Sequence, residues 1–529
     1  MTTEFVKQLN KTTINSDHQF LGQKRFLAKK LKLANIPKNS SLNEEYQALV
    51  SKGDIAPNSQ LEKWLKLNPV RTQSGVAPVA VLTKPYPCPG KCIYCPNQEG
   101  VPKSYLTQEP AVDRAISYQY DPFQQTAGRL KALDATGHAT QKVDLIIVGG
   151  TFLAYEKDYQ EWFIKRCFDA ANKTDSGDLD QAKKENERGP YRLIGISIET
   201  RPDTITSDSI KWLRYLGVTK VELGVQNLND RILKKIKRGH TVKQVVQATR
   251  LLKNAGFKIC YHIMPNLPGA TLKSDLAMFK KLFADPRFRP DMLKIYPCSI
   301  VESAPLYQDF LKGDFQPYSQ NDLTNLLVGI KKNLPEYVRV NRLIRDIPAA
   351  RIVSGNKQTN LRQDIYKIMK AKGISCKCIR CREIKGQTPS SQLELKIKKY
   401  QASGGEEYFL SWVDEQNRLY GLLRLRFPEK KDQANSILLV LKNSALIREI
   451  HIYGTALPLG GYDEKSPQHQ RLGQRLMSRA EQICRRHRAQ RIAVIAGVGT
   501  RNYYQKIGYY LAGEYMIKDI AKISGNRVQ

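Results

Sequence analysis

The sequence predicts an α/β protein in which a partial (β/α) barrel precedes a second, smaller α/β domain. Its 529 residues are more than one ordinary hydrophobic core accommodates. Between residues 78 and 296, short β-branched runs alternate with amphipathic stretches of helical length, which is typical of repeated βα units. Beyond Gly404-Gly405 the pattern changes to a hairpin, a long helix and further strands. We therefore expect an N-terminal segment (1–75), a barrel (76–350), a linker (351–392) and a C-terminal domain (393–529).

The expected elements of the barrel follow one another regularly. Its buried parallel strands are predicted at 79–82, 143–148, 193–198, 220–225, 258–263 and 292–296. Its helices are predicted at 158–171, 207–216, 242–255 and 272–283. The charged stretch 173–190 lacks an apolar period, so we expect an exposed, partly helical excursion there. Ligands of such barrels bind at the carboxyl ends of the strands, so polar residues that follow a strand are site candidates.

The C-terminal domain is predicted to open with a basic helix at 393–400. A hairpin of 408–413 with 419–426, strands at 444–453 and 491–496, and a helix at 468–487 should follow. The turn into the long helix contains Leu472, Gly473 and Gln474, whose backbone N–H groups could bind a pyrophosphate. Such a turn is also typical of an ordinary capped helix.

Three cysteines follow the first predicted strand. Cys88, Cys92 and Cys95 have the spacing C-x3-C-x2-C. Three thiolates on one loop can hold three irons of a [4Fe–4S] cluster and leave the fourth iron open to S-adenosylmethionine. Structural zinc is the alternative, but it requires four ligands, and no further Cys or His is near in the sequence. The ligand number favours the iron–sulfur cluster.

Polar residues also follow the later strands of the predicted barrel. Gly149, Gly150 and Thr151 follow the second strand, Glu199 the third and Gln226 the fourth. Glycines let a cofactor approach the backbone, and Glu199 or Gln226 could bind the amino or hydroxyl groups of S-adenosylmethionine. Each signal is weak alone, because Gly-Gly after a strand is more often a turn. Together with the cysteine loop they predict one site.

A second cysteine group lies in a basic loop after the barrel. Cys376, Cys378 and Cys381 can bind zinc if a fourth ligand comes from elsewhere, and unliganded surface thiols are the alternative. The sequence does not identify the fourth ligand. Six of ten cysteines grouped in this way indicate metal binding in a reducing compartment, so we expect a cytoplasmic protein.

The charge of the chain indicates a polyanionic partner. Lys and Arg number 85 against 50 Asp and Glu, for a net charge of +35. The basic N-terminal segment could be either a solvated helical face or an RNA contact, and the total charge favours RNA. No apolar run has the length of a membrane span, and Met1 is not followed by the apolar stretch of a signal peptide.

Several motifs in one order resemble the family of the Elongator catalytic subunit, tRNA uridine acetyltransferases that join a radical S-adenosylmethionine barrel to a GNAT-type acetyltransferase domain. The resemblance covers nearly the whole chain. The matching stretches are 88–96, 120–122, 149–152, 197–203, 222–226, 238–240, 421–426, 448–454 and 492–504.

The resemblance implies that the adenosyl radical takes hydrogen from the acetyl methyl of acetyl-CoA and that the resulting carbon radical adds to C5 of the wobble uridine. Hydrolysis then releases CoA and leaves a 5-carboxymethyl group. By that similarity, Cys88, Cys92 and Cys95 hold the cluster. Lys142 reaches acetyl-CoA from the barrel, and Tyr503 is a candidate for handling its acyl end. The residues implied to line the acetyl-CoA pocket are Glu449, Ile450, His451, Ile452, Leu472, Gly473, Gln474 and Tyr504.

Two features depart from the family pattern. Eukaryotic members space their cysteines C-x9-C-x2-C, so the compact loop resembles the bacterial branch and implies action without other Elongator subunits. The expected partners are the anticodon stem-loop of tRNA and an electron donor. Arg471 stands where the GNAT pattern Q-x-x-G-x-G has its first glycine after Gln468. Arginine there could obstruct the pyrophosphate or pair with it. Two alternatives are a protein lysine acetyltransferase and a non-catalytic tRNA-binding scaffold.

Overall fold

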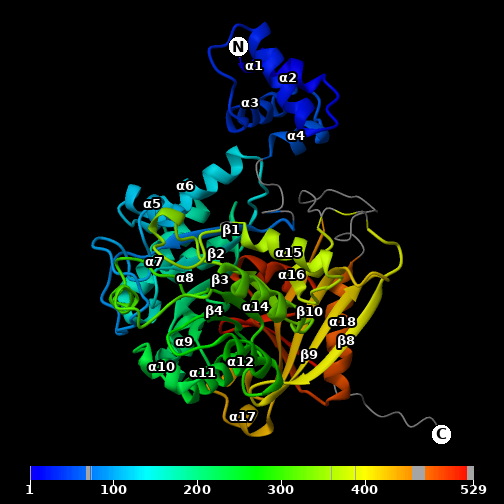
Figure 1. Cartoon of the computed structure of the whole chain (residues 1–529). Coiled ribbons are helices and arrows are strands. Elements are labelled where there is room, and N and C mark those ends of the chain that lie inside the picture. The colour runs from blue at the N-terminus through cyan, green and yellow to red at the C-terminus, as the bar shows by residue number, and fades with distance from the viewer. Residues whose placement is uncertain are drawn as a thin grey trace, which may run out of the picture.

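The computed structural model describes residues 2–66, 72, 74–358, 360–385, 387, 389–454 and 471–520. In this part of the chain a helical lobe precedes two seven-stranded sheets, and the lobe projects from the main body (Figure 1). None of the helices in these ranges is both long and apolar enough to cross a membrane.

The N-terminal lobe is a folded unit with its own core. Its helices are α1 (Thr2–Asn10), α2 (Asp17–Lys30), α3 (Asn39–Ser51) and α4 (Ser59–Leu65). Phe5, Phe20 and Tyr46 are among the buried residues between them. The side chain of Asn43 joins the lobe to the barrel, because its Nδ2 donates to the carbonyl oxygens of residues 134 and 135 at 3.4 and 3.2 Å.

The first sheet is an open parallel barrel whose strands pair in chain order, so that β1 and β7 are its edges. Its strands are β1 (Ala77–Leu82), β2 (Lys142–Val148), β3 (Arg192–Thr200), β4 (Lys220–Gln226), β5 (Lys258–Ile263), β6 (Met292–Ile295) and β7 (Arg339–Arg342). The first six confirm the predicted strands. The seventh was not predicted, because the sequence Arg-Val-Asn-Arg has no apolar run.

Helices cover the outer face of this sheet (Figure 1). The helices of this region are α5 (Pro110–Ser117), α6 (Pro122–Ala135), α7 (Lys157–Asn172), α8 (Leu179–Asn186), α9 (Ser207–Tyr215), α10 (Asp230–Lys235), α11 (Val242–Asn254), α12 (Leu272–Ala284), α13 (Leu306–Leu311) and α14 (Gln320–Lys332). Of these, α10 and α13 pack beside the cysteine loop. Helix α8 confirms the partly helical excursion, and more than half of the residues in 173–190 are exposed as expected, while one face of the helix packs inward. Leu179, Ala182 and Asn186 are buried, and Asn186 donates to the Tyr191 carbonyl oxygen at 3.0 Å.

Two short helices, α15 (Leu361–Ala371) and α16 (Ile379–Arg382), lead to the second sheet, whose order is β13-β14-β12-β11-β10-β9-β8. Its elements are β8 (Glu394–Gln401), β9 (Gly405–Val413), β10 (Leu419–Pro428), α17 (Lys430–Ala434), β11 (Ser444–Ile452), α18 (Leu472–Arg486), β12 (Arg491–Val494), α19 (Arg501–Lys506), β13 (Tyr510–Ala512) and β14 (Tyr515–Asp519). The predicted hairpin is confirmed as the antiparallel pair β9–β10.

The basic helix predicted at 393–400 was wrong, because this stretch forms β8. It pairs with β9 over its whole length, from Glu394 with Val413 to Gln401 with Glu406. As the edge strand it has exposed lysines, which blunt such an edge and hide the strand period. The long predicted helix is confirmed from Leu472, whereas Gln468 lies outside the described residues.

The second domain closes the amino ends of the barrel strands. A Cβ on Gly497 would lie 2.1 Å from the Ile194 carbonyl oxygen, near the start of β3. Arg448 donates to the Phe257 carbonyl oxygen just before β5 at 2.9 Å and to Asp291 just before β6 at 2.8 Å. These ion-paired side chains are fully buried, so the domain contact is desolvated and specific.

Candidate active site

The cysteine loop lies at the carboxyl end of β1. A Cβ on Gly90 would be 3.6 Å from the Sγ atoms of both Cys88 and Cys92, so these sulfurs flank the glycine. The Ile93 backbone fixes the loop, since its N–H donates to Ile236 at 3.2 Å and its carbonyl accepts from Leu306 at 2.8 Å. The loop is therefore ordered by residues far from it in sequence.

Cationic and polar groups surround the sulfurs. Arg238 Nη1 lies 3.4 Å from Cys92 Sγ, and the Thr151 hydroxyl lies 3.9 Å from Cys88 Sγ. Arg201 is anchored on Asp203 through Nε and Nη2, while its buried Nη1 has no partner in the described part of the chain. That nitrogen would be only 2.5 Å from a Cβ on Gly90. Because Gly90 has no side chain, the unpartnered Nη1 donor of Arg201 can lie beside the thiols.

These residues fit an anionic iron–sulfur cluster. The loop offers three thiols, and the neighbouring Arg201 and Arg238 supply positive charge and hydrogen-bond donors for sulfide and thiolate. Burial raises the pKa of the Cys95 thiol to about 11, and the nearby Cys92 adds to this. A cluster would have to displace that proton on binding.

The residues that follow β2 and those at the carboxyl ends of β3 and β4 lie at the same end of the barrel, so Glu199 and Gln226 belong to the strands that they were expected to follow. Gly149 and Gly150 have φ of 133° and 98°, and a Cβ on Gly149 would meet the Thr83 hydroxyl. Glu199 accepts from Tyr105 at 2.7 Å, and Tyr105 belongs to the segment after the cysteine loop. Gln226 has φ of 67°, and its buried Oε1 has no partner among the described residues. These unsatisfied and close-approach positions fit S-adenosylmethionine.

An ionic network that the sequence reasoning missed runs through the barrel interior. His262 Nε2 lies 2.8 Å from Glu222 Oε2, and Lys294 contacts Glu222 and lies 3.3 Å from Glu199. Lys220 lies 3.6 Å from both Asp144 and Glu222. Burial alone would lower the pKa of Lys294, but the Glu222 charge raises it well above its usual value. The sequence did contain a signal for this network. Charged residues stand at alternate positions within otherwise apolar strands, and side chains at alternate positions of a strand point to the same face, here the barrel interior.

In the second domain, the last residues of β11 extend beyond its pairing with β12. β11 pairs with β12 from Ser444 to Ile447, and β11 then continues to Ile452 beyond the end of β12. Beside this free edge, a Cβ on Gly473 would lie 3.4 Å from the Tyr503 hydroxyl and 3.7 Å from Ile452. Tyr504 is buried behind Tyr503, with ring centroids 5.1 Å apart.

The structure divides the residues that were expected to line one acetyl-CoA pocket. Ile450 and Ile452 face Gly473, whereas Glu449 accepts from Arg424 at 2.7 Å and lies 3.7 Å from Lys258 of the barrel. This follows from strand alternation. His451 is on the barrel side with Glu449; burial lowers its pKa to about 4. Gln474 faces a groove on the opposite flank of α18, and Leu472 packs in the core.

Lys142 and Gly149 lie at opposite ends of β2. The strand begins at Lys142 and ends at Val148, which corresponds to roughly 20 Å at 3.3 Å per residue. Lys142 pairs in register with Arg192, and burial lowers its pKa. The cysteine loop and the edge of β11 beside Gly473 are thus at opposite ends of the barrel, and the ionic network lies between them.

The second cysteine group is tighter than the first. The sulfurs of Cys376, Cys378 and Cys381 all lie within 4.8 Å of one another. Lys331 Nζ and the Tyr366 hydroxyl lie 3.3 and 2.8 Å from Cys381 Sγ. Three converging sulfurs supply three of the four ligands that structural zinc takes, and no fourth Cys, His, Asp or Glu of the described residues joins the group.

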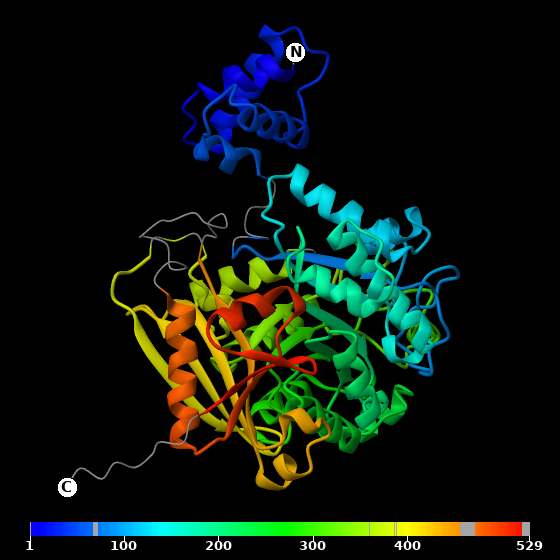
Figure 2. The ribbon, with the colours of Figure 1, turned by 180° about the vertical axis from the view of Figure 1, so that it is seen from behind.

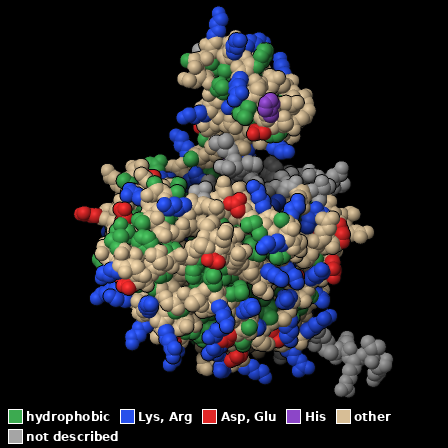
Figure 3. All heavy atoms as spheres, in the orientation of Figure 1, with side chains coloured by type: hydrophobic (Ala, Val, Ile, Leu, Met, Phe, Trp, Pro, Cys, Tyr) green, Lys and Arg blue, Asp and Glu red, His purple; other side chains and the backbone are tan. Residues whose placement is uncertain are grey.

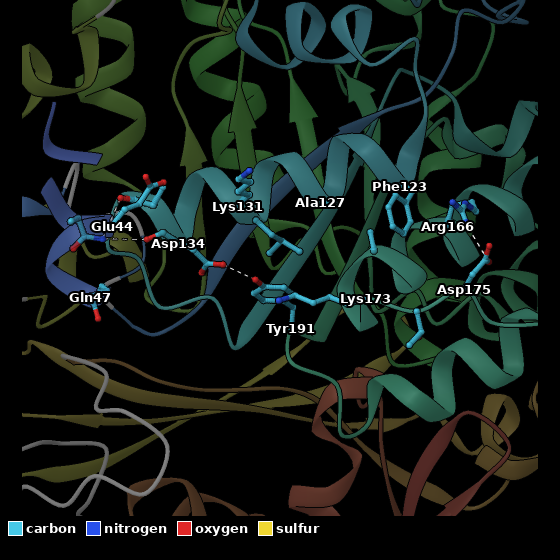
Figure 4. Close-up of a pocket in the computed structure, with 15 residues that line it drawn as sticks. Glu44, Gln47, Phe123, Ala127, Lys131, Asp134, Arg166, Lys173, Asp175 and Tyr191 are labelled. Carbon is cyan, nitrogen blue, oxygen red and sulfur yellow. Dashed lines mark hydrogen bonds and ion pairs between the residues drawn. The ribbon is translucent and has the colours of Figure 1, made fainter. Parts of the chain in front are cut away.

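A cavity of about 830 Å³ lies away from both sites, between the N-terminal lobe and the barrel. Figure 4 shows Glu44 and Gln47 of the lobe on one side and Arg166, Lys173 and Tyr191 of the barrel on the other. None of the residues expected for catalysis, cofactor or metal lines it.

The cysteine loop at the carboxyl end of an open parallel barrel defines a radical S-adenosylmethionine protein. The model of the Radical SAM superfamily matches residues 86–282, and that of the Radical_SAM C-terminal domain matches 290–371. The tRNA uridine(34) acetyltransferase of Methanocaldococcus jannaschii is 44% identical over 470 residues, 86% of each chain. Elongator complex protein 3 of Homo sapiens is 40% identical over 472 residues, also 86% of each.

A solved structure agrees with these relatives. The Methanocaldococcus infernus Elp3 with an N-terminal deletion is 40% identical, with a TM-score of 0.74, and the match covers 84% of this chain and 99% of that one. The chain belongs to the family of tRNA uridine(34) acetyltransferases and Elongator complex protein 3.

Proposed function

We propose that this protein is a tRNA uridine-34 acetyltransferase that uses S-adenosylmethionine and acetyl-CoA to place a carboxymethyl group on C5 of the wobble uridine. The observation that carries the proposal is the combination, in one chain, of a thiol loop with free donors and an unpaired edge of β11 beside Gly473 at the other end of the same barrel. The extent of similarity to the named relatives supports it.

Cys88, Cys92 and Cys95 would hold the [4Fe–4S] cluster. Gly149, Gly150 and Thr151, with Glu199 and Gln226, would bind S-adenosylmethionine, which when bound to a reduced cluster supplies a 5′-deoxyadenosyl radical. The free Nη1 of Arg201 would donate to the cluster, and the free Oε1 of Gln226 would accept from the cofactor. Tyr105 and Lys294 would hold the Glu199 carboxylate in position to contact S-adenosylmethionine.

Acetyl-CoA would bind along the free edge of β11. The small Gly473 lets the pantetheine arm pass between Ile452 and Tyr503, and Tyr504 supports the Tyr503 ring from behind. Lys142 would approach the acyl end from the barrel side, where burial beside Arg192 lowers its pKa. Arg471 has the left-handed αL conformation, with φ of 51°. Glycine is common in this conformation, which agrees with the glycine of the family pattern, and an arginine adopts it at a cost in backbone strain.

The RNA would be held by charge. On the face shown in Figure 3, Lys and Arg side chains greatly outnumber Asp and Glu. We propose the anticodon stem-loop as the bound element, an electron donor as a further partner, action without other Elongator subunits, and a cytoplasmic location. Zinc on Cys376, Cys378 and Cys381 would stiffen the basic loop between the domains.

The test is acetyl-CoA hydrolysis by the reconstituted protein with and without tRNA, followed by mass spectrometry of the digested RNA. We expect RNA-dependent hydrolysis and a 5-carboxymethyl group at position 34. Hydrolysis or lysine acetylation without RNA would favour the lysine acetyltransferase. Tight tRNA binding without acetyl-CoA binding would favour the non-catalytic scaffold.

A further inference from the structure

A basic groove runs along the flank of α18 that faces away from the acetyl-CoA pocket. It has a volume of about 540 Å³. Its lining, which we call the α18 groove, consists of Leu395, Trp412, Arg471, Gln474, Arg475, Ser478, Arg479 and Gln482. Three of these eight residues are arginines and none is acidic, so the groove attracts anions.

The groove exists because no described element covers the sheet beside α18. Strands β8 and β9 are joined by a tight turn, in which Ala402 N donates to the Gly405 carbonyl oxygen at 2.9 Å and Ser403 and Gly404 both have positive φ. The connection therefore contributes no helix to the face of these strands. Helix α18 packs on β10 and β11, and in Figure 2 it is the helix seen lying over this side of the described sheet.

The floor of the groove combines an aromatic ring with a guanidinium group. The Arg475 guanidinium lies 4.2 Å from the Trp412 ring centroid. Trp412 is only 5% exposed, and its indole N–H has no hydrogen-bond partner among the described residues. A buried donor of this kind costs free energy unless a ligand or water accepts from it. The groove thus offers both charge and an unused donor.

The arginines are spaced along one line. Arg475 and Arg479 are one helical turn apart, which is about 6 Å along the axis. In the described part of the chain neither has a carboxylate within ion-pair distance, and Arg479 donates only to the neutral Gln482 at 2.9 Å. They are therefore available to successive phosphates of one strand. Planar guanidinium groups bind phosphate bidentately and stack on bases.

We propose that the α18 groove binds the phosphate backbone of the tRNA outside the anticodon loop, as a second anchor. This rests on the proposed function, because the net charge of +35 indicates RNA and the family supplies tRNA as the RNA. The pocket beside Gly473 lies on the other flank of α18, so acetyl-CoA and the RNA occupy different faces of one helix. Contacts of this kind position the RNA without reading its sequence.

The experiment compares two double variants of equal charge change. Arg475→Gln with Arg479→Gln removes two groove charges. The matched control, Arg486→Gln with Arg488→Gln, removes two exposed charges at the far end of the same helix. The affinity for tRNA is measured by fluorescence anisotropy over a range of salt concentrations, and free CoA is titrated separately.

We expect the groove variant to bind tRNA about tenfold more weakly than the control at low salt, with a salt slope shallower by roughly 1.4 to 1.8, or 0.7 to 0.9 per lost contact. Its affinity for CoA should be unchanged. A third variant, Arg475→Lys with Arg479→Lys, should retain most of the slope, which separates loss of charge from loss of folding.

Equal tRNA affinity and slope in the groove and control variants would overturn the inference, provided the unmutated protein binds tRNA. Loss of CoA affinity instead of tRNA affinity would also overturn it and assign the groove to the phosphates of CoA. If the unmutated protein bound no tRNA, the proposed function itself would fail. This failure can be told from failure of the groove inference, because it is seen in the unmutated protein without any variant.

Discussion

The two cysteine groups of this chain have the same number of thiols and different surroundings. The sulfurs of Cys88 and Cys92 flank Gly90, with arginine nitrogens close to them. Those of Cys376, Cys378 and Cys381 converge within 4.8 Å, beside Lys331 and a tyrosine hydroxyl. Converging sulfurs suit a single ion, whereas a loop surrounded by free donors suits a larger anionic cluster. The comparison teaches that two groups with equal numbers of thiols can differ in how closely the sulfurs converge and in which charged groups surround them.

The largest effect is expected from Cys92→Ala. Removal of one of three thiolates should abolish cluster assembly, because each holds a different iron. Iron content and reductive cleavage of S-adenosylmethionine should fall to background, while zinc content is retained. Iron that persists in this variant and disappears from Cys378→Ala would reverse the assignment of the two groups.

Gly90→Ala tests the close approach of Arg201. The new methyl group would lie 2.5 Å from Nη1 of this buried arginine, so the loop or the guanidinium must move. We expect cleavage of S-adenosylmethionine to fall roughly 100-fold, as for a displacement of about 1 Å in a reactive site. Gly22→Ala is the control, since nothing lies within 4 Å of its Cβ. If Gly90→Ala cleaved S-adenosylmethionine as fast as the control, the close approach of Arg201 to Gly90 would not be needed for the reaction.

Cys378→Ser should remove zinc and leave the cluster. Cys378 is fully buried at the junction where Ile379 N donates to the Val338 carbonyl oxygen at 2.9 Å. Loss of the ion leaves polar groups without partners, so the free energy of unfolding should fall by roughly 1 to 3 kcal/mol. Denaturant unfolding and elemental analysis measure both effects. Unchanged stability together with unchanged zinc would favour unliganded thiols.

Lys331→Met should produce the smallest effect. Its ammonium group lies 3.3 Å from Cys381 Sγ and stabilises the thiolate without being a ligand. Zinc affinity should fall about tenfold, the lower end for a residue that supports a ligand. Competition with a chromophoric chelator measures it. Lys332→Met, on the exposed side of the same helix, is the matched control and should change nothing.

Much of the barrel follows from the sequence because its strands are buried on both faces. Runs such as 143–148 and 258–263 are rich in apolar residues, and six of the seven strands were predicted from runs of this kind. The polar β7 and the lysine-rich β8 escaped this reasoning. Both are edge strands, and neither shows the apolar run of a buried strand.

The candidate sites divide in the same way. The sequence by itself determined which residues could ligate a metal, because thiol number and spacing are local properties of a loop. It also determined the excess of basic charge. Only the tertiary structure decided that Glu222, His262 and Lys294 meet inside the barrel, that Gln474 faces away from Gly473, and that Lys142 and Gly149 lie at opposite ends of β2. The physical reason is that these relations depend on strand register and on the flank of a helix that is left uncovered. Register and packing are set by contacts between segments far apart in the chain.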